Sequence, residues 1–123
     1  MLKEGRNYMD TQSLHTTLLE QGQNTLASMD NLKKKANRKG DQRAALYENF
    51  RANEHSFRVY TFADPEIGER AEVQAFLEKV EAFEALFQGV DTERETNVDS
   101  GQSKELYEQA VTAYDNMVEG FNR

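Results

Sequence analysis

Three arginines are the side chains of this chain best suited to bind a small anion. Arg51 and Arg58 are seven positions apart, which places both on one face of a helix, and Arg70 follows in the next expected helix. A guanidinium can hold a carboxylate through two parallel hydrogen bonds, so these arginines could clamp an organic acid or an amino acid. The plain alternative is a set of salt bridges with the helix that follows. The acidic residues of that helix include Glu69, Glu72, Glu78, Glu81 and Glu84.

Small or polar residues interrupt the apolar stripes of the first two expected helices. Gly22 and Thr25 lie on the first stripe, and Asn53 and Glu54 lie on or beside the second. A hairpin that turns near residue 39 brings the four to one level, where a glycine opposite polar side chains leaves a notch. Buried polar groups need partners, and a ligand in the notch would be one. The structural alternative is a hydrogen-bonded pair or a buried water that fixes the register.

The other reactive residue types form no recognisable catalytic or metal motif. His15 and His55 lie on different expected helices, and neither belongs to a Glu-x-x-His pair. The sequence has no cysteine, no nucleophile elbow and no phosphate-cradling glycine loop. We therefore predict no enzyme activity, no metal site and no cofactor.

An acidic segment before the last expected helix resembles the start of a calcium loop. Oxygen side chains alternate from Asp91 to Asp99, but the central glycine is missing and Gln102 stands where a bidentate glutamate should be. We expect a solvated acidic loop at this position instead.

Composition favours one small acidic domain. The chain has 123 residues, which suffices for a single core, and a net charge of −7, which disfavours nucleic acid as a partner. Residues 1–60 carry 10 basic and 7 acidic side chains, whereas residues 61–123 carry 5 and 15, so the two halves should attract each other when folded. No apolar run is long enough to span a membrane. Any membrane attachment would therefore depend on flanking segments.

Four segments repeat apolar residues in steps of three and four, which predicts an all-α fold. We expect helices over residues 10–37, 42–62, 65–88 and 103–122. Asp64 should cap the third helix and Pro65 open it, and Ser103 should cap the fourth. Short connections favour an antiparallel up-down-up-down four-helix bundle that forms a single domain over residues 1–123. The stripe expected on the second helix is Leu46, Phe50, Asn53, Phe57 and Tyr60, with Tyr47, Glu54 and Thr61 alongside it.

The expected topology also places the loops. Both chain ends should lie at the end of the bundle that carries the turn at Ala63–Pro65. The basic segment 33–39 and the acidic loop 91–99 should meet at the opposite tip, where they neutralise each other.

The stretch from Phe50 to Pro65 resembles the passage between the second and third helices in the helical sensor domains of bacterial chemoreceptors and sensor kinases. Those domains have a helix with arginines and aromatic residues, a short turn at an aspartate, and then a helix with the pattern of residues 73–86. The stretch from Leu106 to Phe121 is similar to their last helix, which re-enters the membrane. The resemblance covers residues 45–123 at the level of pattern.

The resemblance implies a non-catalytic ligand-sensing domain that transmits a signal in a bacterial transmembrane receptor. Such a domain is extracytoplasmic (periplasmic), and its membrane-spanning helices would lie in flanking sequence. We expect a homodimer through the first and fourth helices, in which a ligand biases two packings of the bundle. The ligand-binding arginines of the family's first helix have no counterpart, since that helix carries only Arg38 near its end. No ligand site is therefore carried over from the family.

A second interpretation belongs to another class. A small acidic protein of this kind could be a cytoplasmic adaptor or a phage-encoded inhibitor that acts by binding another protein, because its net charge suits a basic surface. For the sensor interpretation, the ligand is an organic acid or an amino acid. The residues expected to bind it are Gly22, Thr25, Arg51, Asn53, Glu54, Arg58 and Arg70.

Overall fold

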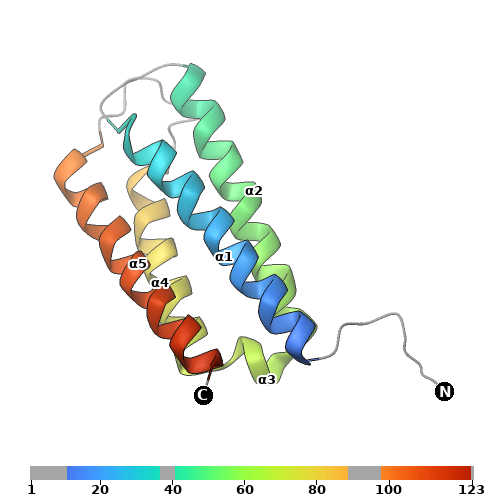
Figure 1. The fold of residues 1–123 in the computed structure, drawn as a ribbon. Coiled ribbons are helices and arrows are strands. Elements are labelled where there is room, and N and C mark those ends of the chain that lie inside the picture. Colours follow the sequence, from blue (N-terminus) through green and yellow to red (C-terminus); the bar gives the residue numbers. More distant parts are fainter. Residues whose placement is uncertain (1–10, 37–40, 89–97, 123) are drawn as a thin grey trace.

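The computed structural model describes residues 11–36, 41–88 and 98–122. These residues form five helices and no strand, which confirms the all-α prediction. The helices are α1 (Thr11–Lys33), α2 (Asp41–Ala63), α3 (Pro65–Gly68), α4 (Ala71–Leu86) and α5 (Ser100–Phe121). The long helices α1, α2, α4 and α5 lie side by side, and the short α3 crosses at the end where α1 begins and α5 finishes (Figure 1).

The long helices do not all approach one another in the same way. The backbones of α1 and α2, of α4 and α5, and of α1 and α5 come close together. Helices α2 and α4 meet through aromatic side chains instead. The rings of Phe57 and Phe76 are 5.1 Å apart, and those of Phe50 and Phe83 are 5.6 Å apart, both edge to face. The arrangement is compatible with a bundle of four long helices.

The core is built from the stripes that the sequence indicates. On α1, Leu18, Thr25, Met29 and Leu32 are buried, as expected from their spacing. Helix α5 has a broader apolar face because it packs on both α1 and α4. Its buried residues include Ala110, Ala113, Tyr114, Met117 and Phe121.

The buried stripe of α2 differs from the expected one. Leu46, Asn53 and Tyr60 are only half-buried. In each case the residue that follows in the sequence is buried instead. The buried stripe is Tyr47, Phe50, Glu54, Phe57 and Thr61. Both stripes have helical spacing, so packing on α1 and the aromatic contacts with α4 together decide which of them faces the core. One consequence is that a glutamate, Glu54, lies inside.

The helix expected over residues 65–88 is interrupted. Asp64 caps α3 through a hydrogen bond from Glu66 N to its side chain (3.0 Å), as predicted, but α3 ends at Gly68. Arg70 then takes an extended conformation (φ −62°, ψ 144°), and α4 starts at Ala71. The side chain of Gln74 donates to the carbonyl oxygen of Gly68 (2.7 Å) and so satisfies the end of α3. Residues 69–71 favour a helix locally, and packing of Gly68 on α2 overrides that preference.

Two further helix boundaries differ from the predicted ones. Helix α1 ends at Lys33, and residues 34–36 form a tighter turn in which Lys35 N donates to Leu32 O (2.9 Å). Helix α5 begins three residues before Ser103, because the Asp99 side chain accepts a hydrogen bond from Gln102 N (3.0 Å) and forms the cap. The loop predictions for residues 37–40 and 89–97, including most of the calcium-like segment, lie outside the described residues.

Candidate functional site

An open groove runs along the outer side of the contact between α2 and α4. Its volume is about 510 Å³. The groove is lined by Tyr47, Arg51, Arg58, Glu81, Glu84, Ala85 and Gln88. The aromatic pairs in the core keep α2 and α4 apart, which leaves room for the groove between their outer edges. A smaller hollow of about 220 Å³ lies beside it and adds Glu54 and His55 to the lining. The lining residues of α2 recur in steps of three and four, so one face of that helix supplies them all.

Both arginines of the groove pair with carboxylates. The Nη2 atom of Arg58 donates to Glu54 Oε2 (2.9 Å) on its own helix and to Glu81 across the groove on α4. Arg51 lies 3.7 Å from Glu48 and 3.9 Å from Glu84, with its guanidinium over the Tyr47 ring. The salt bridges expected between the second helix and the acidic helix that follows are therefore present. They also join the two halves of the chain, which carry opposite net charge.

Two glutamates share this cluster at close range. Glu54 is only 5% exposed, and Glu84 of α4 forms a hydrogen bond with it. Burial, this hydrogen bond and the charge of Glu54 raise the pKa of Glu84 to about 7, although Arg51 and Arg58 oppose the shift. The proton of this carboxyl pair is therefore placed on Glu84, the group whose pKa is raised.

This carboxyl pair predicts a pH dependence of stability. The folded state holds the Glu84 proton up to a pKa of about 7, whereas the unfolded chain releases it near the ordinary value of 4.5. The folded state therefore binds more protons between these values, and the free energy of unfolding should fall as the pH rises through that range. Replacing Glu84 with glutamine should remove this fall. Urea unfolding of both proteins between pH 4.5 and about 7 tests the prediction. If the free energy of unfolding changed with pH equally in both proteins, the prediction would be contradicted.

The notch expected at Gly22 is filled. A Cβ atom at Gly22 would lie 2.9 Å from Cε1 of Tyr114 and 3.5 Å from Cε of Met117, so the glycine makes room for side chains of α5. The Tyr114 hydroxyl donates to the carbonyl oxygen of Leu19 (3.0 Å), which fixes the ring in place. The prediction of an open notch is therefore wrong. It overlooked that α5 packs on this face of α1.

Replacing Gly22 with alanine should consequently destabilise the protein. The clash with Tyr114 costs about 1–3 kcal/mol, and the gain in helix propensity offsets at most about 1 kcal/mol of it. We expect the midpoint of urea unfolding to fall, while the dependence of the free energy of unfolding on urea concentration stays unchanged. A midpoint equal to or above that of the wild type would mean that the ring moves aside freely.

The other expected site residues do not join the groove as a group. Thr25 is buried and donates to the carbonyl oxygen of Gln21 (2.8 Å), which satisfies its hydroxyl within α1. Asn53 is half-buried and points about 100° around the helix from Glu54. Only Arg51, Glu54 and Arg58 of the predicted residues come together here. Whether any of them binds a ligand stays a prediction.

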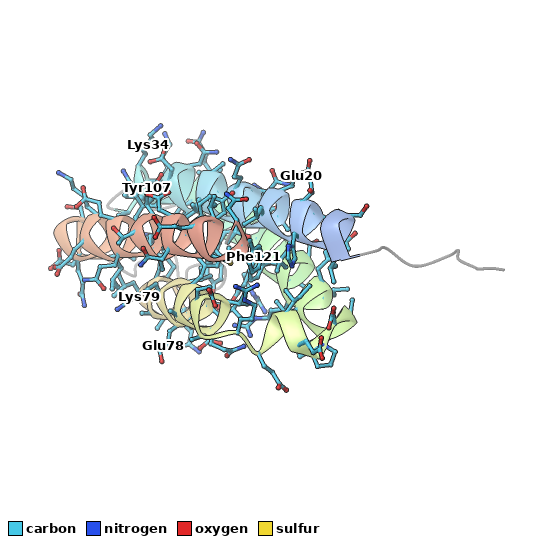
Figure 2. All side chains as sticks on the ribbon, turned by 60° about the horizontal axis from the view of Figure 1, so that its bottom comes forward. Glu20, Lys34, Glu78, Lys79, Tyr107 and Phe121 are labelled. Carbon is cyan, nitrogen blue, oxygen red and sulfur yellow. The ribbon has the colours of Figure 1, made fainter. Side chains whose placement is uncertain are left out.

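Arg70 lies at another place from Arg51 and Arg58. It donates to the carbonyl oxygen of Gly120 (2.9 Å), pairs with Glu72 (3.2 Å), and lies over the Phe121 ring (4.8 Å). His15 of α1 stacks on the same ring at 4.5 Å. Figure 2 labels Phe121 near the end of α5. The expected approach of Arg70 to the other arginines is thus wrong. The side chain of Arg70 instead connects the start of α4 to the end of α5.

Two residues of the groove and one buried arginine were not among the predicted ligand-binding residues. Tyr47 lines the groove, and Glu84 was expected only as a salt-bridge partner. Arg43 is buried and donates to the carbonyl oxygen of Ala36 (2.8 Å), beyond the end of α1. The signal for Tyr47 was available in the sequence, since Tyr47, Glu54 and Thr61 have the same helical spacing as the expected stripe. Nothing in the sequence indicated that Arg43 would be buried.

The described residues contain no group of three or more histidine, aspartate or glutamate side chains placed to hold a metal ion. Within the same residues, no helix is long and apolar enough to cross a membrane. The chain matches no protein-family model, and no curated protein or solved structure matches it. The function must therefore be argued from the side chains of the groove and of the surface.

Proposed function

We propose that the chain is a non-catalytic ligand-sensing and signal-transmitting domain, an antiparallel four-helix bundle with its ligand site in the α2–α4 groove. One observation carries the proposal: Arg51 and Arg58 lie beside the Glu54–Glu84 carboxyl pair, where the groove adjoins the smaller hollow. Guanidinium groups and a carboxyl pair are complementary to the two ends of an amino acid.

The chemistry of the groove suggests how an amino acid would bind. Its ammonium group would take the place of the proton between Glu54 and Glu84, where two carboxylates can share one cation. Its carboxylate would compete with Glu81 for Arg58 and with Glu84 for Arg51. An organic acid would use the arginines alone. The ligand class is thus a small carboxylate, and an α-amino acid fits best.

Binding at this place would act on the contact between two helices. The contact of Arg51 with Glu84 and the ion pair of Arg58 with Glu81 join α2 to α4 across the groove. A ligand that replaces these pairs favours a different spacing of α2 and α4, and this difference is the signal. The homodimer through the first and last helices, the receptor and the extracytoplasmic location are part of the same proposal. They rest on the resemblance to sensor domains.

A thermal-shift screen tests the ligand site. The purified chain is heated with amino acids, organic acids, amines and metal salts, and only a ligand that prefers the folded state raises the melting temperature. We expect a rise with amino acids or organic acids that Arg51→Gln abolishes. Lys79→Gln removes a positive charge from α4 outside the groove and should leave the rise unchanged. No rise from any class, or an equal loss in both variants, would overturn the proposal.

A second candidate function is an acidic module that binds a basic protein surface. Carboxylates are exposed along α4 and α5, among them Glu78, Glu108 and Asp115, and Figure 2 shows Glu78 pointing away from α4. A groove of about 510 Å³ between these helices includes Glu105 and Glu108 in its lining. A partner captured by the chain should then be released by salt and bound more weakly by the Glu105→Gln, Glu108→Gln variant. Binding that neither change affects would exclude this candidate.

A further inference from the structure

An uncharged stripe runs along the outer side of α2. Ala52, His55, Val59 and Phe62 follow one another in steps of three, four and three, and all four are exposed. Val59 is 48% and Phe62 77% exposed, and they are the only large apolar side chains exposed in the part of the chain that the structure describes. The spacing is that of a seam between two packed helices. Apolar surface of this kind on a soluble domain marks an interaction site.

A small pocket continues the stripe at the corner between α2 and α3. Its volume is about 170 Å³. The pocket is lined by Thr61, Phe62, Pro65, Gly68, Glu69 and Gln74. A partner side chain in this pocket would pack beside the Phe62 ring and be shielded from water. Such a central apolar anchor supplies much of the affinity in protein interfaces.

The rim of this corner is acidic. Glu66 and Glu69 are both exposed, and among the described residues no basic side chain forms an ion pair with either of them. The exposed or half-exposed arginines of α2, Arg51 and Arg58, already pair with carboxylates of the groove. The surface is therefore uncharged along its length, apolar at Val59 and Phe62, and negative at its α3 end.

We propose that the outer stripe of α2 and the α2–α3 corner dock a basic amphipathic helix of another protein. The apolar face of that helix would lie along Ala52 to Phe62, a length of about 15 Å or roughly three turns. Its lysines or arginines would face Glu66 and Glu69. A second copy of this chain is a poorer occupant, because each copy carries a net charge of −7 and presents the same acidic corner. His55 also lines the hollow beside the α2–α4 groove, but Ala52, Val59 and Phe62 line neither, so the inference rests on these three whether or not a ligand binds there.

A defined peptide probe tests the inference. A fluorescent synthetic helix of about four turns, with leucines on one face and lysines on the other, is titrated with the full chain. We expect saturable binding. Two matched peptides, one with serine in place of leucine and one with glutamate in place of lysine, should not bind. Phe62→Ser should weaken the binding about tenfold or more, and circular dichroism should show that this surface variant folds normally.

Charge variants separate docking from general attraction. The double variant Glu66→Gln, Glu69→Gln should weaken binding of the basic peptide several-fold. It should also make that binding less sensitive to salt. Glu20→Gln combined with Asp115→Asn removes the same charge from α1 and α5 and should have no effect. Binding that Phe62→Ser leaves unchanged, or that both charge pairs weaken equally, would overturn the proposal. It would also be overturned if the chain sediments as a dimer that Phe62→Ser dissociates, because a second copy would then cover the stripe.

Discussion

Replacing Phe57 with alanine should lower the free energy of unfolding by about 3–5 kcal/mol. Phe57 is 1% exposed and packs edge to face on Phe76, 5.1 Å between ring centroids, in the contact that joins α2 to α4. Truncation leaves a cavity that helices propped apart by aromatic rings cannot easily close. A loss of this size is a large share of the about 5–15 kcal/mol that stabilises an ordinary domain. Urea unfolding followed by circular dichroism measures it.

The same helix provides a matched control. Phe62→Ala removes the same atoms from a side chain that is 77% exposed, so it should change the free energy of unfolding by less than about 0.5 kcal/mol. Both variants are measured at a protein concentration low enough for the chain to be monomeric. A small loss at Phe57, or equal losses at the two positions, would contradict the register of α2.

Replacing Gly68 with alanine should destabilise the protein by about 1–3 kcal/mol or more. A Cβ atom at this position would lie 2.2 Å from the carbonyl oxygen and 2.9 Å from the carbonyl carbon of Thr61. These are backbone atoms of α2, so they cannot turn away as the end of a flexible side chain would. The alanine would therefore push α3 away from α2 and weaken the hydrogen bond between Gln74 and Gly68 O.

Gly101 is the matched control for this substitution. It lies in the first turn of α5, is exposed, and has only the Asp99 side chain near the position of an added Cβ atom (3.3 Å). Because alanine favours a helix over glycine, Gly101→Ala should be neutral or raise the free energy of unfolding by up to about 1 kcal/mol. A loss at Gly101 equal to that at Gly68 would show that the cost is not due to the contact with Thr61.

Local patterns in the sequence determined the elements of this fold. The steps of three and four predict helices wherever α1, α2, α4 and α5 occur, and Asp64-Pro65 correctly predicts a new helix start. The same periodicity identifies most of the core, including Leu18, Met29 and Phe57. These features could be predicted because helix formation and capping depend on residues within a few positions of one another.

The tertiary structure alone decided which faces and charges meet. Two stripes on α2 have the same spacing, and only packing against α1 and α4 turns Glu54 inward to meet Glu84. Tyr114 fills the space at Gly22 from a helix about ninety positions further along the chain. The contact of Gly68 with Thr61 ends α3 in a segment that favours a helix locally. These outcomes depend on partners that are distant in sequence, and helical periodicity carries no information about which faces pack together.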